Sequence, residues 1–327
     1  MPISDETIDN PRAPRIRRAA DLMDARARVR YGRMLVEGPQ AVREAIAFAA
    51  GGLHDVLVET AGGPSATDEG GRGRVWASPR LAGLVEDADA AGAYVHPVTP
   101  RVMRRLAPEA QGIVAVADLP SPSLPRDAHG RCPGMVAAFW QIRDPGNAGA
   151  VVRVADAAGC AAVVLVDDCV DAYGPKVVRS SVGSLFHLPV VHLSTLDFLA
   201  WSAGSGLPLV AADVHGTSGR RPVPLPALVA RRSVASRRGR VCALFGNEAR
   251  GLPDSLLVRA DEVAAIPMYG HAESLNLATS AAVLLYALAM SGRQGGRGVS
   301  ADDGVATDGA DVGKGVARPD GEAAVVE

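Results

Sequence analysis

The chain has 327 residues, of which only two are lysine, four are cysteine and 4% are aromatic. The cysteines lie far apart and form no CxxC pair, which argues against a zinc site and against a secreted domain built on disulfides. No apolar run approaches the roughly 20 residues that span a bilayer. The first ten residues carry acids without an apolar segment, unlike a signal peptide. We therefore expect a cytoplasmic protein that uses neither a membrane nor a metal.

Nucleotide-binding loops are missing as well. The chain contains neither the GxGxxG loop of dinucleotide-binding domains nor the GK[ST] of a phosphate loop. This absence excludes a nucleotide-dependent dehydrogenase on a doubly wound sheet.

Positive charge is supplied almost entirely by arginine, and it is unevenly distributed. Eight arginines lie between Arg12 and Arg33 against two acids, and five more lie between Arg231 and Arg240. From Ala301 onward acids predominate, so the rest of the chain is net basic, which suits a polyanionic partner. A coding bias toward arginine explains the same composition, and a solvated amphipathic helix explains the Arg12–Arg33 cluster, so both alternatives stay open.

Composition divides the chain into two segments that each alternate strand and helix patterns. Residues 1–14 and 292–327 are expected to be disordered, the latter because glycines and acids leave too little apolar surface to offset the ordering entropy. Prolines interrupt residues 118–133 and predict a linker. The remaining segments, 15–117 and 134–291, predict a two-domain α/β protein.

The second segment has the stronger strand signals. Continuous apolar runs suit parallel strands that are covered on both faces, and they lie at 135–140, 162–166, 209–211 and 241–245. In the first segment the expected strands lie at 34–37, 56–58, near Tyr94 and at 113–116, and the expected helices begin at Pro39, Leu81 and Pro100. A final helix is predicted over 275–290.

Three loops that follow strands have unusual sequences, and such loops bind ligands in parallel sheets. The first runs from Arg143 to Arg153. Asn147 in this loop suits the cap of the following helix, which would explain the residue without any function. Arg153 lies nearly two turns into an otherwise apolar helix, where its guanidinium needs a carboxylate, a phosphate or water.

The other two loops run from Phe245 to Leu252 and from Ile266 to Leu277. In the first of these, two glycines surround Glu248 and favour a fixed carboxylate, although a plain turn with a solvated glutamate is an equal alternative. In the second, Ser274 suits the cap of the final helix.

In this order, DPGNAGAVVRVADAAG, LFGNEARGL and IPMYGHAESLNLATSAAVLLYAL resemble the three motifs of the SpoU/TrmH family of RNA ribose 2′-O-methyltransferases, in the SPOUT class. The resemblance covers about 134–291. RMLVEGPQAVREAI at 33–46 also resembles the start of an L30e/L7Ae-like substrate-binding domain, which would occupy 15–117.

The resemblance implies a parallel-sheet α/β domain with a C-terminal trefoil knot, a homodimer, and S-adenosyl-L-methionine as cofactor, held largely by backbone groups. By motif match, the cofactor-binding residues are Leu244, Gly246, Ile266, Met268 and Leu275. The catalytic and substrate-positioning residues are Asn147, Arg153, Glu248, Ser274 and Asn276.

Arg153 resembles the family residue that activates the ribose hydroxyl. Because a guanidinium pKa above about 12 makes a poor free base, we expect it to grip an RNA phosphate. Glu248 is then a second base candidate, or an ion-pair partner of Arg153.

The stretch 173–186 resembles the family region that faces RNA. Four residues there are expected to contact phosphates, namely Lys176, Arg179, Ser180 and Ser181. The additional N-terminal domain favours 23S rRNA as substrate. A tRNA 2′-O-methyltransferase and a non-catalytic RNA-binding or ribosome-assembly factor are the alternatives, and the intact set of five polar residues counts against the second.

Overall fold

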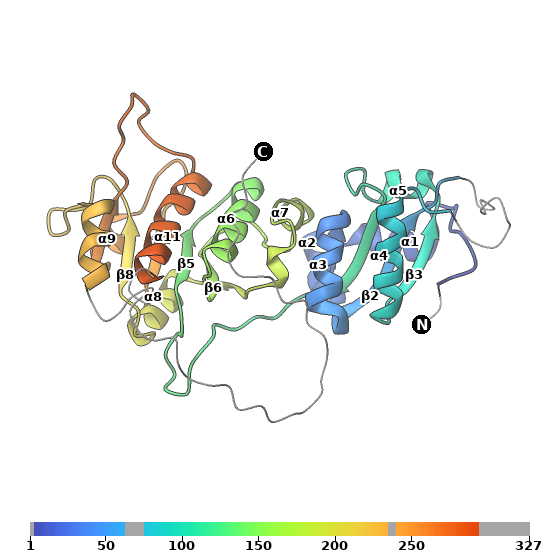
Figure 1. Cartoon of the computed structure of the whole chain (residues 1–327), viewed down its shortest axis with the longest axis horizontal. Helices are drawn as coiled ribbons and strands as arrows, with labels where there is room; N and C mark the ends of the chain where they lie inside the picture. The colour runs from blue at the N-terminus through green and yellow to red at the C-terminus, as the bar shows by residue number, and fades with distance from the viewer. Residues whose placement is uncertain (1–2, 63–74, 235–239, 294–327) are drawn as a thin grey trace, which may run out of the picture. The chain divides into compact units, whose positions relative to one another are not determined.

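A computed structural model describes residues 3–62, 75–234 and 240–293 (Figure 1). Its strands form two separate sheets, one within residues 33–118 and the other within 136–265. Two α/β segments were expected at these places, and their boundaries at 117 and 134 stay a prediction. The glycine-rich stretch 63–74 and nearly all of the predicted tail, from residue 294 on, lie outside the described residues.

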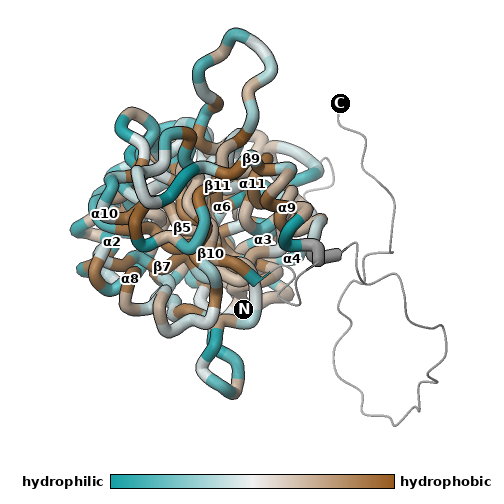
Figure 2. The backbone as a smooth tube through the Cα atoms, turned by 90° about the vertical axis from the view of Figure 1, so that its left-hand side faces the viewer, coloured by the Kyte–Doolittle hydropathy of each residue, from teal (hydrophilic) through white to brown (hydrophobic). Residues whose placement is uncertain are grey.

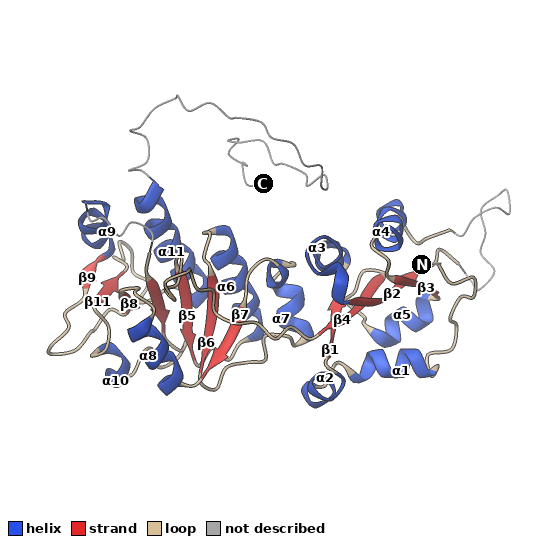
Figure 3. Ribbon diagram, turned by 90° about the horizontal axis from the view of Figure 1, so that it is seen from below, coloured by secondary structure: helices blue, strands red, loops and turns tan. Residues whose placement is uncertain are grey.

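The first sheet has four strands in the order β1-β4-β2-β3, with helices on both faces (Figure 3). Successive side chains of a strand point to opposite faces, so Met34 and Val36 pack toward α3 and α4, whereas Leu35 packs toward α1 and α5. The elements are α1 (Pro14–Asp21), α2 (Ala25–Tyr31), β1 (Arg33–Glu37), α3 (Pro39–Ala49), β2 (Leu53–Glu59), α4 (Pro79–Ala90), β3 (Tyr94–Val98), α5 (Pro100–Leu106) and β4 (Ile113–Asp118). The L30e/L7Ae likeness of this segment stays a prediction.

Residues 3–14 are described in the structure and bond to β3, although disorder was predicted for residues 1–14; residues 1–2 lie outside the described residues. The Ser4 and Ile8 amides each donate to a carbonyl of β3 at 2.9 Å, and the Thr99 amide donates to the Ile8 carbonyl at 3.1 Å. An edge strand presents unpaired backbone groups. Pairing with β3 therefore supplies hydrogen bonds that the composition of the segment does not reveal.

The second sheet has seven strands in the order β7-β6-β5-β10-β8-β11-β9, and all its described pairings are parallel. The predicted apolar runs form β5, β6, β8 and β10, and β7 and β9 are additional short strands. The strands are β5 (Val136–Trp140), β6 (Ala162–Val166), β7 (Val190–Leu193), β8 (Leu209–Ala212), β9 (Val223–Pro224), β10 (Cys242–Phe245) and β11 (Glu262–Ala265). Figure 2 shows the apolar β5 and β10 inside the fold.

Helices cover both faces of this sheet (Figure 3). Phe139 and Phe245 stack at 5.0 Å between ring centroids under α6 and α11, and Phe198 of α8 is fully buried on the other face. The helices are α6 (Pro145–Ala157), α7 (Pro175–Ser180), α8 (Thr195–Gly204), α9 (Leu225–Val234), α10 (Asp254–Leu257) and α11 (Leu277–Arg293). No helix in the described ranges is long and apolar enough to cross a membrane. The trefoil knot stays a prediction.

A buried carboxylate at the end of β1 contacts helix α7. The Glu37 side chain is 2% exposed, and its Oε2 accepts a hydrogen bond from Arg179 Nη1 at 3.1 Å. Its Oε1 has no partner among the described residues. Burial raises the pKa of Glu37, and the Arg179 guanidinium opposes that rise.

We predict that Arg179→Met destabilises the protein more at pH 8 than at pH 5. Without the guanidinium the pKa of Glu37 rises further. The folded state then favours the protonated acid, so its stability is retained in acid and lost as pH rises through the folded-state pKa. Leaving a buried acceptor unpaired costs about 1–3 kcal/mol. Thermal melting at both pH values measures the effect. The double variant Glu37→Gln/Arg179→Met is expected to lose the pH dependence, and an equal loss for Arg179→Met at both pH values would contradict the assignment.

Candidate functional site

Two of the three motif loops leave the sheet at the same edge. Strands β5 and β10 are neighbours with Phe139 opposite Phe245, so the loops after them begin side by side. Strand β11 lies beyond β8 in the same parallel sheet, and its loop leads to the start of α11. Ligands bind at carboxyl edges of this kind.

Asn147 does not cap helix α6, contrary to the structural explanation considered for it. The cap is Asp144, whose Oδ1 accepts the Asn147 amide at 2.7 Å. The Asn147 side chain is thereby left to bridge two other loops. Its Nδ2 donates to Glu248 Oε1 at 3.1 Å, and its Oδ1 accepts from Asn276 Nδ2 at 3.0 Å.

Asn276, rather than Ser274, caps the final helix. Its Oδ1 accepts the Ala278 amide at 2.8 Å, and α11 begins at Leu277 instead of the expected residue 275. Ser274 lies exposed in the preceding loop. Three of the five predicted catalytic residues therefore form one hydrogen-bonded group, the amide–carboxylate cluster of Asn147, Glu248 and Asn276.

This cluster is supported by three residues that the sequence analysis did not single out, namely Asn247, Gln141 and Arg250. Asn247 is 9% exposed, and its Nδ2 donates to the Gln141 carbonyl at 2.7 Å and to Glu248 Oε2 at 3.4 Å. Arg250 donates to Gln141 Oε1 at 2.7 Å, and its guanidinium lies 5.8 Å from the centroid of the Trp140 ring. Because Asn247 directly precedes Glu248 in the sequence, its amide could have been predicted as a partner of the carboxylate. The left-handed φ of +51° at Gln141 left no trace in the sequence.

The loop that carries Glu248 closes on its own backbone. Asn247 and Gly251 exchange backbone hydrogen bonds of 3.2 and 2.9 Å. A Cβ at Gly246 would lie 2.3 Å from the Gly251 carbonyl carbon and 2.6 Å from the Leu252 amide nitrogen. Gly246 is therefore required by close backbone approach, which holds the carboxylate in place as the two glycines suggested.

The loop after β11 has the polar groups that a cofactor held by backbone needs. Within this described stretch, residues 267–275 make no backbone–backbone hydrogen bond; Ile266, Met268 and Leu275 are half-buried, and residues 269–274 are exposed. Backbone groups that other parts of the protein leave unpaired can bind water or a ligand. Together with apolar side chains they fit a ligand that has an aromatic base and hydroxyl groups. Leu244 differs from these residues, since its side chain is fully buried in the sheet core.

Arg153 lies outside the amide–carboxylate cluster. It is exposed on α6, six residues after Asn147 and on a different side of the helix. Within the described chain it forms no ion pair, so the alternative pairing with Glu248 is absent in this structure.

The predicted RNA-facing residues divide by exposure. Lys176 and Arg179 are exposed on α7. Ser180 donates to the Pro145 carbonyl at 3.0 Å, where α7 packs closely on α6. Ser181 is fully buried and donates to the Val178 carbonyl at 2.7 Å, so its side chain cannot reach a phosphate at the surface.

The chain is similar to relatives and solved structures that are named as RNA or rRNA methyltransferases. The chain is 30% identical over 178 residues to the 23S rRNA (guanosine(2553)-2'-O)-methyltransferase RlmP of Bacillus subtilis, a match that covers 54% of this chain and 64% of the relative. It is 34% identical over 182 residues to the 23S rRNA (uridine(2479)-2'-O)-methyltransferase of Streptomyces viridochromogenes, covering 53% and 58%. The chain thus spans less than two thirds of the length of these relatives.

Solved structures match over more of the chain. A crystal structure of an RNA 2'-O ribose methyltransferase has a TM-score of 0.68 at 30% identity, covering 88% of this chain and 99% of that one. The AdoMet-bound rRNA methyltransferase of Sinorhizobium meliloti has a TM-score of 0.67 at 25% identity, covering 86% and 96%. Residues 134–286, which include the whole amide–carboxylate cluster, match the SpoU rRNA Methylase family. The chain belongs to the SpoU family of methyltransferases.

Proposed function

We propose that this protein transfers a methyl group from S-adenosyl-L-methionine to a ribose 2′-hydroxyl of 23S rRNA. The amide–carboxylate cluster carries the proposal, because it places a fixed carboxylate beside a loop in which residues 267–275 make no backbone–backbone hydrogen bond within the described chain. The two relatives named as 23S rRNA 2'-O-methyltransferases support the substrate.

The residues of the chain supply positioning and a proton acceptor. S-Adenosyl-L-methionine, when bound, supplies a methyl group on a positively charged sulfur. Gly246, Ile266, Met268 and Leu275 form the cofactor site through their backbone groups and apolar surfaces. Placing two reactants in line at roughly 3–3.5 Å is the main contribution that an enzyme can make to such a transfer.

Glu248 is the proton acceptor in this scheme. The Asn147 and Asn247 amides donate to its two oxygens, and the carboxylate stays exposed to an incoming hydroxyl. General bases contribute typically 10²–10⁴-fold to rate. Asn276 orients Asn147 from the start of α11, and Ser274 lies in the adjoining loop as a further substrate contact.

Arg153 grips an RNA phosphate and orients the ribose. Its guanidinium is exposed and forms no ion pair with the described residues, which suits bidentate phosphate binding. Lys176 and Arg179 on α7 add two phosphate contacts, with Ser180 at the α6 junction. The homodimer is supported by an exposed apolar stripe on α11 at i, i+3 and i+7, where Val283, Tyr286 and Met290 are 39%, 42% and 53% exposed.

The experiment that tests the function is methyl transfer from labelled S-adenosyl-L-methionine to unmodified 23S rRNA, 16S rRNA and tRNA, with the product mapped by alkaline hydrolysis. We expect one hydrolysis-resistant ribose in 23S rRNA, because a 2′-O-methyl group removes the internal nucleophile. Label in tRNA alone would keep the chemistry and overturn the substrate. RNA binding without cofactor binding would favour a non-catalytic RNA-binding factor.

We predict that Glu248→Gln lowers kcat by about 10²–10⁴-fold while the affinity for S-adenosyl-L-methionine and the Tm stay unchanged. The amide keeps an oxygen for the Asn147 hydrogen bond and gives up only the 3.4 Å bond from Asn247, whose Nδ2 still donates to the Gln141 carbonyl, but it no longer accepts a proton. Single-turnover methyl transfer measures the effect, with Glu86→Gln on α4 as the matched control for lost charge. An unchanged kcat would place the base elsewhere.

We predict that Gly246→Ala weakens cofactor binding at least tenfold. The added Cβ meets backbone rather than a movable side chain, so the 246–252 loop must shift. Isothermal titration with S-adenosyl-L-methionine measures the change. Gly219→Ala, whose Cβ meets no atom within 4 Å, is the control. Equal affinity for both variants would remove the 246–252 loop from the cofactor site.

A further inference from the structure

A cleft lined by arginines lies between helices α1 and α5, on the face of the first sheet opposite α3 and α4. It has a volume of about 820 Å³, and its lining includes Arg12, Arg17, Arg101 and Arg105 with one carboxylate, Asp21. We call it the arginine cleft. It belongs to the segment that precedes the SpoU match, and neither the motif loops nor α7 contributes to it.

The fold holds these arginines together from two parts of the chain. Ile16 of α1 is 1% exposed and packs in the same core as Val102 and Leu106 of α5. This apolar contact leaves Arg101 and Arg105 on the outer side of α5, one turn apart. The ordered segment before α1 ends at Asn10, whose Oδ1 accepts the Arg12 amide at 2.9 Å and directs the chain to the cleft.

The four guanidiniums of the cleft outnumber its carboxylates, since Asp21 is the one acid among the lining residues and it also lines the neighbouring hollow. None of them forms an ion pair or a side-chain hydrogen bond in the described part of the chain. Other arginines of the same cluster are paired, since Arg15 contacts Asp55 at 3.2 Å and Arg28 contacts Asp171. Like charges one helical turn apart repel each other, so the arrangement favours an anion with several charged groups.

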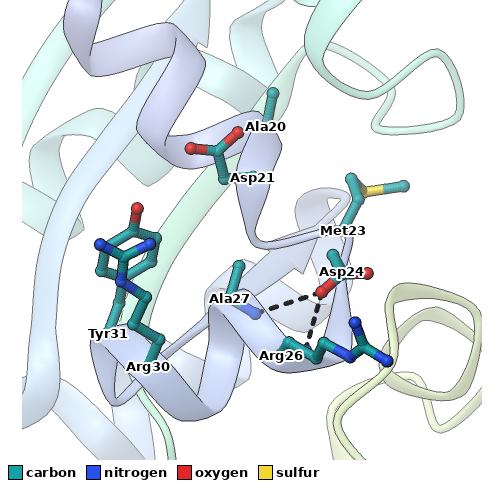
Figure 4. A pocket seen from close by; sticks show the side chains of 8 residues that line it. All are labelled: Ala20, Asp21, Met23, Asp24, Arg26, Ala27, Arg30 and Tyr31. Carbon is teal, nitrogen blue, oxygen red and sulfur yellow. Dashed lines mark hydrogen bonds between the residues drawn. The ribbon is translucent and has the colours of Figure 1, made fainter.

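A neighbouring hollow between α1 and α2 offers a contrast (Figure 4). It has a volume of about 480 Å³, and its two arginines, Arg26 and Arg30, are balanced by Asp21 and Asp24. The Arg30 guanidinium lies 5.5 Å from the centroid of the Tyr31 ring, and Asp24 caps α2. The excess of positive charge is therefore localised in the arginine cleft.

We infer that the arginine cleft binds successive phosphates of the substrate RNA backbone. The inference rests on the proposed function, since it takes the same RNA as ligand. A row of guanidiniums recognises phosphate through bidentate hydrogen bonds without reading base sequence. The cleft thereby fixes the register of the RNA on the first domain and leaves selection of the ribose to the motif loops.

The test compares two double variants with the same loss of charge. Arg101→Gln/Arg105→Gln removes half of the arginines of the cleft, and Arg26→Gln/Arg30→Gln removes the pair from the adjacent hollow. The dissociation constant for an unmodified 23S rRNA transcript is measured between 50 and 300 mM salt. Each phosphate contact contributes about 0.7 to the slope of log affinity against log salt for a single strand and about 0.9 for duplex DNA. We expect the cleft variant, which loses two contacts, to lose about 1.4–1.8 from this slope and the control variant to keep it.

In the cleft variant we expect KM for RNA to rise. We expect no change in its affinity for S-adenosyl-L-methionine, in its Tm or in its kcat at saturating RNA. An equal loss of slope in both variants would show an effect of net charge and overturn the inference. Wild-type slope in the cleft variant would overturn it as well. The dissociation constant is measured without methyl transfer. If only the cleft variant has a smaller salt slope, the inference about the cleft therefore stands even when the protein shows no methyl transfer. If the cleft variant transfers methyl groups and its salt slope is unchanged, the proposed function stands and the inference about the cleft fails.

Discussion

The parallel pairing of β5 with β10 is the constraint on which the candidate site depends. It places residues about a hundred positions apart in the sequence at one edge of the sheet, with Phe139 and Phe245 stacked directly beneath that edge. From there Asn147 reaches Glu248, and α11 brings Asn276 to the same point. Weakening this pairing would separate the carboxylate from the amides that orient it, even if each loop kept its local conformation.

Close backbone approach completes the arrangement. Gly246 lets the 246–252 loop fold onto its own backbone, and Gly149 lets α6 contact α7, where a Cβ would lie 1.9 Å from Ser180 Oγ. These contacts use hydrogen bonds and steric fit instead of long side chains, so little side-chain entropy is lost in holding them. The loop 267–275 does the reverse, because it leaves its own backbone groups open. The site therefore combines one closed loop that fixes a carboxylate with one open loop that suits a ligand.

The structure divides the abundant arginines into two classes. Arg15, Arg28 and Arg179 form ion pairs with carboxylates from distant parts of the chain and contribute to the fold. The arginines of the cleft between α1 and α5, together with Arg153, have no such partner among the described residues. Net charge alone does not distinguish these classes, since the difference depends on which carboxylate the fold brings within reach. The second class can bind a polyanion without giving up a carboxylate partner, whereas Arg179 would have to share its guanidinium between a phosphate and Glu37.

The sequence by itself determined the two α/β segments, the four principal strands of the larger sheet and the three motif loops, because apolar runs and turn residues act over short distances. Helices α3 and α5 begin at the predicted residues, Pro39 and Pro100. Tertiary structure decided which polar residue does what. Asn147 and Ser274 both suit a helix cap, but Asp144 and Asn276 take those positions, and this leaves Asn147 free to bind Glu248. The order of residues 4–10 and the burial of Ser181 were equally beyond reach, because both follow from contacts with distant elements that no local pattern records.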